Sequence, residues 1–81
     1  MRKYCLVKVK WEDASGQGSW QTLEEARESE LATIETCGYI VKTDAHKVVV
    51  VGSLDNRGLC MDRNTISKRC IISITRLEKE K

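Results

Sequence analysis

The sequence contains no phenylalanine, two tyrosines and a single histidine, so it has few groups suited to acid–base chemistry. General acid–base and nucleophilic catalysis both need partner side chains within hydrogen-bond reach of one another. His46 lies in a predicted turn, and no serine or cysteine motif accompanies it. Asp44, which precedes it closely, is typical of a turn aspartate that accepts backbone hydrogen bonds. We therefore expect a protein that is not an enzyme and has no catalytic residue.

Closely spaced metal ligands are also missing. Zinc sites use three or four ligands, which usually occur in closely spaced pairs, and this chain offers one histidine and no Cys-x-x-Cys pair. We expect no metal site and no cofactor. Free cysteine is commonly a small buried apolar residue, which is how we interpret the four cysteines, Cys5, Cys37, Cys60 and Cys70.

No stretch approaches the ~18 consecutive apolar residues of a membrane-spanning helix. The first residues are basic, as in a signal peptide, but Lys8 and Lys10 interrupt the segment that would have to be apolar. The length of 81 residues, with 41% hydrophobic and 32% charged side chains, suits one folded domain. We expect a cytoplasmic protein without a membrane partner, with one domain over residues 1–81 that ends in a solvated tail, residues 78–81.

Acidic side chains are concentrated in one segment, although the whole chain has a net charge of +2. Residues 12–35 contain seven acidic residues and one basic residue, whereas residues 1–11 contain four basic residues and no acidic one. The surface is therefore polarised if the acidic segment packs as one protrusion.

Hydrophobic periodicity predicts five strands. Alternate residues from Cys5 to Trp11 share one side of the first strand, so we expect Trp11 in the core. The run 48–51 is apolar on both faces, which favours a central or doubly covered strand. Gly38 indicates a bulge or sharp bend in the second strand. The expected strands cover residues 4–11, 32–43, 47–54, 59–62 and 70–77.

The connections between these strands define the expected fold. Thr22 and Glu25 have the spacing of a helix capping box, which predicts a short helical insertion over residues 21–30. The other connections are expected to be a loop over 12–19, turns at 44–46 and 55–58, and one helical turn over 64–68. Five short strands of this spacing suit an all-β protein, a small, strongly bent antiparallel barrel. A long first connection and a single turn before the last strand are typical of Src-homology-3-like barrels. The Sm-like fold has a related five-stranded core, and strand counting does not separate the two.

Four segments resemble a group of small, mostly uncharacterised bacteriophage proteins. That group pairs a strand ending in tryptophan with a second tryptophan beyond a loop, then a Gly-Tyr-Leu-Val strand, then an Ile-Pro-Lys turn before the last strand. Ser67 stands here where proline is common in the group. The matching segments, residues 9–13, 19–20, 38–41 with Asp44, and 66–74, span most of the chain. The resemblance implies a phage-encoded protein that acts in the host cytoplasm.

A second resemblance is to Sm-like RNA-binding proteins. Gly38, Ile40 and Asp44 are similar to their first motif, with Val48 where that family has asparagine. The segment 63–66 is similar to their Arg-Gly-x-x-Ile motif, with Asn64 in place of the glycine. This resemblance implies binding of RNA.

Basic residues form the candidate nucleic-acid or nucleotide site. Lys8 and Lys10 share the outer face of the first strand, and the first and last strands of a small barrel commonly lie side by side. We therefore expect the basic residues to converge in a patch that can hold phosphates, unless they are solubilising lysines on an edge strand. Barrels that bind single strands add exposed aromatics for stacking. The candidates are Lys8, Lys10, Arg63, Lys68 and Arg69, with Trp20 or Tyr39 for stacking.

Trp20 has two interpretations. It either folds over one end of the barrel as a lid or stands at a binding or subunit surface, and tryptophan is enriched in both places. Short domains often need a partner subunit, so we expect a homo-oligomer. One function hypothesis is binding of RNA or a small nucleotide, for example a nucleotide signal of host defence. The other is binding of a host protein through the Trp20 loop and the acidic helical turn.

Overall fold

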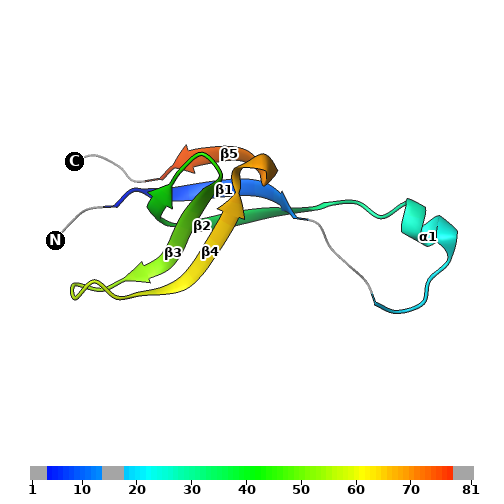
Figure 1. Ribbon diagram of the computed structural model, residues 1–81, viewed down its shortest axis with the longest axis horizontal. Coiled ribbons are helices and arrows are strands. Elements are labelled where there is room, and N and C mark those ends of the chain that lie inside the picture. The colour runs from blue at the N-terminus through cyan, green and yellow to red at the C-terminus, as the bar shows by residue number, and fades with distance from the viewer. Residues whose placement is uncertain (1–3, 14–17, 78–81) are drawn as a thin grey trace.

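The computed structural model describes residues 4–13 and 18–77. Its five strands form one antiparallel sheet (Figure 1). The strands lie in the order β4-β3-β2-β1-β5, so four consecutive strands form a meander and β5 returns to the free side of β1. The expectation of an all-β protein with five antiparallel strands is confirmed. The strands are β1 (Leu6–Asp13), β2 (Ala32–Thr43), β3 (Lys47–Leu54), β4 (Cys60–Ser67) and β5 (Ile71–Arg76).

The core lies on one face of this sheet. Val7 and Val9 of β1 are buried, whereas Lys8 between them is half-buried, as strand alternation requires. Residues directly opposite each other on paired strands lie on the same face, so the core continues across β3 and β4. One buried cluster results, made of Val7, Val9, Val48, Val50 and Ile66.

Trp11 packs at the border of this cluster and is half-buried. Its indole Nε1 donates a hydrogen bond to Thr36 Oγ1 at 3.0 Å, which pairs the polar end of the ring while the rest contacts the core. The predicted core role of Trp11 is therefore confirmed in part. Cys5, expected on the same inner side of the strand, is exposed.

β3 is covered on both faces, as its apolar run predicts. Val48, Val50 and Val51 each have 1% of their surface exposed. Successive side chains of a strand point to opposite faces, so burial of both Val50 and Val51 requires cover on each side. The strand also has the predicted bounds, Lys47–Leu54.

Gly38 marks a close approach of two strands. A Cβ atom built on Gly38 would lie 2.6 Å from the carbonyl oxygen of Val51, closer than a side-chain carbon can sit. The irregularity in the pairing of β2 with β3 falls between Ile40 and Lys42, beyond the glycine. Gly38 is thus needed for space, and the bulge expected at this residue lies further along the strand.

β4 is longer than expected, and the helical turn after it is shifted. Residues 64–67, expected to be helical, continue the strand because β3 pairs with them, for example Val49 with Thr65. The turn is the 3-10 helix η1 (Lys68–Cys70), and Ser67 Oγ accepts a hydrogen bond from Arg69 N at 3.4 Å. Lys68 N donates to His46 O at 2.9 Å, which joins this crossover to the turn between β2 and β3.

The connection between β1 and β2 carries a short helix away from the sheet. The helix α1 (Leu23–Arg27) is shorter than the expected 21–30 and has no buried residue. Figure 1 shows α1 at the opposite end of the molecule from the β3–β4 hairpin, and the longest extent of the chain is 53 Å. Asp13 pairs with Ala32, so β1 and β2 meet at the base of the connection. We call residues 18–31 the arm; loop residues 14–17 and the predicted tail 78–81 lie outside the described residues.

The cysteines differ from the expectation. Cys5, Cys37 and Cys60 are exposed, Cys70 is half-buried, and all four are free. Predicting burial was wrong for three of them. Cys37 lies opposite Lys8 on the solvent face of the β1–β2 pair, and Cys60 begins β4 in the hairpin beyond the core.

Candidate interaction surfaces

The arm exposes large apolar side chains. Trp20 is 100% exposed, Leu23 73% and Leu31 57%. Of the two interpretations of Trp20, the lid is therefore wrong, because a lid would bury the indole against the sheet. The arm extends from the sheet instead, and Trp20 lies at its surface.

The arm is also acidic, and its helix begins with a complete capping box. Thr22 Oγ1 accepts a hydrogen bond from Glu25 N at 3.1 Å, and Glu25 Oε1 accepts one from Thr22 N at 2.9 Å. The hydrogen bonds from the Thr22 backbone and then from its hydroxyl hold the pKa of Glu25 below the ordinary value of 4.5. All acidic side chains of the arm are exposed, namely Glu24, Glu25, Glu28 and Glu30.

Lys8 and Lys10 lie on the face of β1 opposite the core, as predicted. Both are next to Glu35 of β2. The Lys8 ammonium lies 3.6 Å from the Glu35 carboxylate, and Lys10 pairs directly with Glu35 across the strands. Glu35 thus reduces the positive charge at this position, a contribution that the spacing of the lysines alone did not reveal.

Tyr39 and Arg63 lie in one cross-strand row on the same face. Tyr39 of β2 pairs with Val51 of β3, and Val51 pairs with Arg63 of β4. Because directly opposed residues share a face, Tyr39 and Arg63 flank the buried Val51. The pairing of Leu6 with Tyr39 places this row on the face that carries Lys8.

Lys68 and Arg69 lie elsewhere. β5 does run beside β1, as expected, but Thr75 and Ser73 are the residues that lie opposite Lys8 and Lys10. Ile66 before η1 is buried in the core and Ile71 after it packs against the core, so η1 crosses on the core side of the sheet. The predicted basic residues therefore do not gather on one face.

The edge strand β5 exposes a second group of apolar side chains. Ile72 is 52% exposed, Ile74 43% and Leu77 41%. Ile74 pairs with the buried Val9, so it lies on the core face of the sheet at its open edge. Leu77 N donates to Leu6 O, so Leu77 lies in the row of Leu6 on the opposite face of the sheet. We call Lys68, Arg69, Ile72 and Ile74 the β5 lip. The apolar pattern of residues 70–77 predicted a strand but did not show that its outer side is bare.

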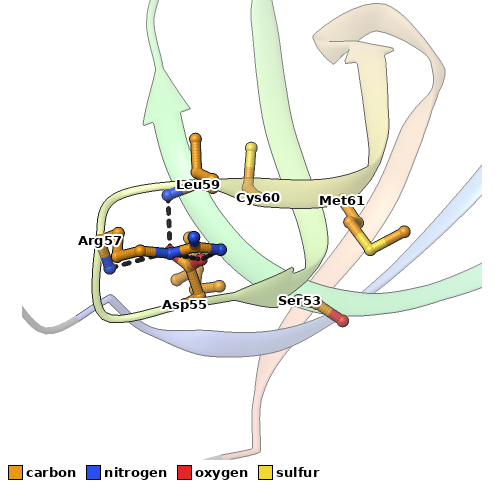
Figure 2. Close-up of a pocket in the computed structure, with 7 residues that line it drawn as sticks. Ser53, Asp55, Arg57, Leu59, Cys60 and Met61 are labelled. Carbon is orange, nitrogen blue, oxygen red and sulfur yellow. Dashed lines mark hydrogen bonds and ion pairs between the residues drawn. The ribbon is translucent and has the colours of Figure 1, made fainter.

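The β3–β4 hairpin holds a hollow of ≈ 400 Å³ that sequence reasoning missed (Figure 2). Its lining comes from residues 53–55, 57 and 59–61. Asp55 fixes the turn, because its carboxylate accepts hydrogen bonds from Leu59 N at 2.8 Å and from Arg57 Nε at 2.8 Å. These bonds, that of Leu59 first, lower the pKa of Asp55 below 3.8. The apolar run Leu59, Cys60 and Met61 directly after the predicted turn is the sequence signal that could have indicated the hollow.

Within residues 4–13 and 18–77, no three histidine, cysteine or acidic side chains come together as metal ligands. In the same part of the chain, no helix is long and apolar enough to span a membrane. The chain was also compared with models of known protein families, with curated proteins and with solved structures, and none of the three comparisons found a match. Fold and surface therefore define it as a small antiparallel β-protein with an exposed acidic arm.

Proposed function

We propose that the chain is a non-enzymatic protein-binding module and that the arm is its contact element. The observation that carries the proposal is the complete exposure of Trp20 together with the exposure of Leu23 and Leu31 in the arm, whose helix has no buried residue. Tryptophan is among the residues that contribute most to binding energy when a partner buries them. An apolar group of this size on a projecting element is typical of a binding surface.

The arm also defines the chemistry of its partner. The arm carries four exposed glutamates together with these apolar side chains, so the fitting surface has an apolar depression and basic residues. Charge pairs at the rim of an interface favour association and weaken as salt rises. Hence partner binding should depend on Trp20 for affinity and on the glutamates for salt sensitivity.

The proposal includes a finer fold assignment. The strand order, with β5 beside β1 and a 3-10 turn before β5, supports a barrel of the Src-homology-3-like or Sm-like kind. In such a barrel the long first connection is a usual place for binding residues, because loops on a rigid scaffold often carry function. Origin in a bacteriophage and action in the host cytoplasm follow from the resemblance alone.

A second candidate function is binding of RNA or a nucleotide on the face that carries Lys8. The row of Tyr39, Val51 and Arg63 favours it, because it places an aromatic ring and a guanidinium on that face. The ion pair between Lys8 and Glu35 argues against strong phosphate binding there. This candidate predicts that Arg63→Glu weakens binding of a single-stranded oligonucleotide, whereas Lys68→Glu, the same charge change on the other side of the sheet, does not.

The test compares three immobilised baits in one cell extract: the native chain, Trp20→Ala and Leu59→Ala. Leu59 is the matched control because it is also a large exposed apolar residue, 58% exposed, but lies in the β3–β4 hairpin. The proposal predicts a set of proteins retained by the native chain and by Leu59→Ala and lost with Trp20→Ala. It also predicts that raising the salt concentration releases this set.

Two results would contradict the proposal. One is a set of retained proteins that is unchanged by Trp20→Ala. The other is retention of nucleic acid, removed by nuclease and by Arg63→Glu, with no protein that depends on the arm. The second result would support the nucleotide candidate in its place.

A further inference from the structure

The β5 lip has the chemistry that the arm requires of a partner. It combines exposed Ile72 and Ile74 with Lys68 and Arg69 of the adjoining η1. Among the described strands β5 lies at an edge of the sheet, and none of them pairs with its outer side. An exposed apolar edge is a common site of pairing with another chain. The same molecule thus carries an acidic apolar projection and a basic apolar surface.

The arm of one molecule does not cover its own lip. Trp20 is completely exposed, and no residue of α1 is buried. Figure 1 shows α1 well separated from β5, beyond the end of β1. The two surfaces can therefore meet only between molecules.

We propose that the partner of the arm is a second copy of this chain, an inference that rests on the proposed function of the arm. The arm of one copy packs on the β5 lip of the other, and the second arm packs on the first lip, so the dimer is symmetric and closed. The glutamates of each arm then lie beside Lys68 and Arg69 of the other copy. Trp20 is placed against Ile72 and Ile74, which are left bare at the open edge of the core.

The surface area is sufficient for such a dimer. Burial of a tryptophan removes on the order of 200 Å² from water. The two leucines of the arm add to this, each lip loses a similar area, and the twofold symmetry doubles every contact. The total reaches the roughly 1,200 Å² at the lower end of specific protein interfaces.

Sedimentation equilibrium tests the dimer directly. We expect the native chain to sediment at about twice its mass of 9.2 kDa. Trp20→Ala should raise the dissociation constant on the order of 1,000-fold, about 30-fold for each of the two symmetric contacts, the effect of removing a residue that dominates an interface. The matched control Leu59→Ala should leave the dissociation constant unchanged, because the hairpin takes no part in the contact. A native chain that stays monomeric at ~100 μM, well above the micromolar range of specific pairing, overturns the inference.

A charge exchange tests which surfaces meet. One variant carries Glu24→Lys and Glu28→Lys, which reverses the net charge of the arm but leaves the capping box intact. The other carries Lys68→Glu and Arg69→Glu, which reverses the charge of the lip. Each variant alone should be monomeric, because like charges then face each other. An equimolar mixture should form a heterodimer, since one interface regains the native charges and the other pairs a basic arm with an acidic lip.

The outcomes separate this inference from the function on which it rests. Restoration of a dimer only on mixing supports the arm–lip contact, and a mixture that stays monomeric overturns it. If the native chain is monomeric but Trp20→Ala loses proteins in the extract experiment, the arm still binds a protein, but not a second copy. A dimer that persists in Trp20→Ala and in both charge variants contradicts the self-association through the arm. Circular dichroism of each variant, compared with the native chain, confirms that the sheet is folded.

Discussion

At the residue scale, Gly38 occupies a site where β2 and β3 leave no room for a side chain. Gly38→Ala would place a Cβ 2.6 Å from the Val51 carbonyl oxygen, which is backbone and cannot rotate away. We expect this substitution to lower the free energy of unfolding by about 1–3 kcal/mol, the usual effect of overpacking. The measurement is chemical denaturation of the two chains. Gly18→Ala is the control, because nothing lies within 4 Å of that position, and its effect should stay within about 0.5 kcal/mol.

Asp44 gives the stability of the sheet a dependence on pH. Its Oδ1 accepts hydrogen bonds from His46 N at 2.8 Å and Lys47 N at 2.9 Å, and these bonds, that of His46 first, lower its pKa below 3.8. A carboxyl whose pKa is lower in the folded state stabilises the fold above its ordinary pKa. That contribution is lost as the pH falls through the folded value. Unfolding curves between pH 6 and pH 3, a range of about three units around the ordinary carboxyl pKa, should therefore show lower stability at the acid end.

Asp44→Asn separates charge from hydrogen bonding at this turn. The asparagine carbonyl can still accept from His46 N and Lys47 N but does not titrate in this range. We expect the variant to depend less on pH than the native chain between pH 5 and pH 3, about the range in which aspartates titrate. Equal slopes for the two chains would show that Asp44 does not contribute to the acid sensitivity. The pKa values of Asp55 and Glu25 are also lowered, so these two groups contribute to the remaining dependence.

At the element scale, α1 is independent of the core. The Thr22–Glu25 capping box stabilises it, and none of its residues is buried. Thr22→Ala removes the N-cap, which should destabilise the helix by about 1 kcal/mol. Hydrogen exchange should then be faster at the Ala26 and Glu28 amides, which donate within the helix, and unchanged at the amides of β3. Faster exchange throughout the sheet would indicate that the arm does pack on it.

The elements also show how far the sequence alone was informative. β2 and β3 have their predicted bounds because their apolar residues carry the pattern themselves. β4 was assigned too short, because the largely polar segment 64–68 was expected to form a helical turn, and only pairing with β3 makes residues 64–67 a strand. Trp20 could be interpreted either as a lid or as a surface residue, since the choice depends on the absence of contacts in three dimensions. The bare edge of β5 could not be predicted, because it depends on which strand lies at the end of the sheet.

At the scale of the whole molecule, the sheet maintains the fold, and the arm, which has no buried residue in its helix, is free for the contact proposed above. Asp13 and Ala32 are paired at the base of the arm, so residues 14–31 can be replaced by an Asn-Gly turn that closes β1 and β2 into a hairpin. The shorter connection also reduces the entropy of loop closure. The arm contributes no residue to the buried core cluster, so little stabilising burial is lost.

The most direct test is the free energy of unfolding of this armless chain and of the native chain. Both are measured at dilutions where they sediment as monomers, because association adds apparent stability. We predict that the armless chain is as stable as the native chain or more stable. A loss of more than about 2 kcal/mol, a large share of the stability of a small domain, would contradict the account by showing that the arm belongs to the fold.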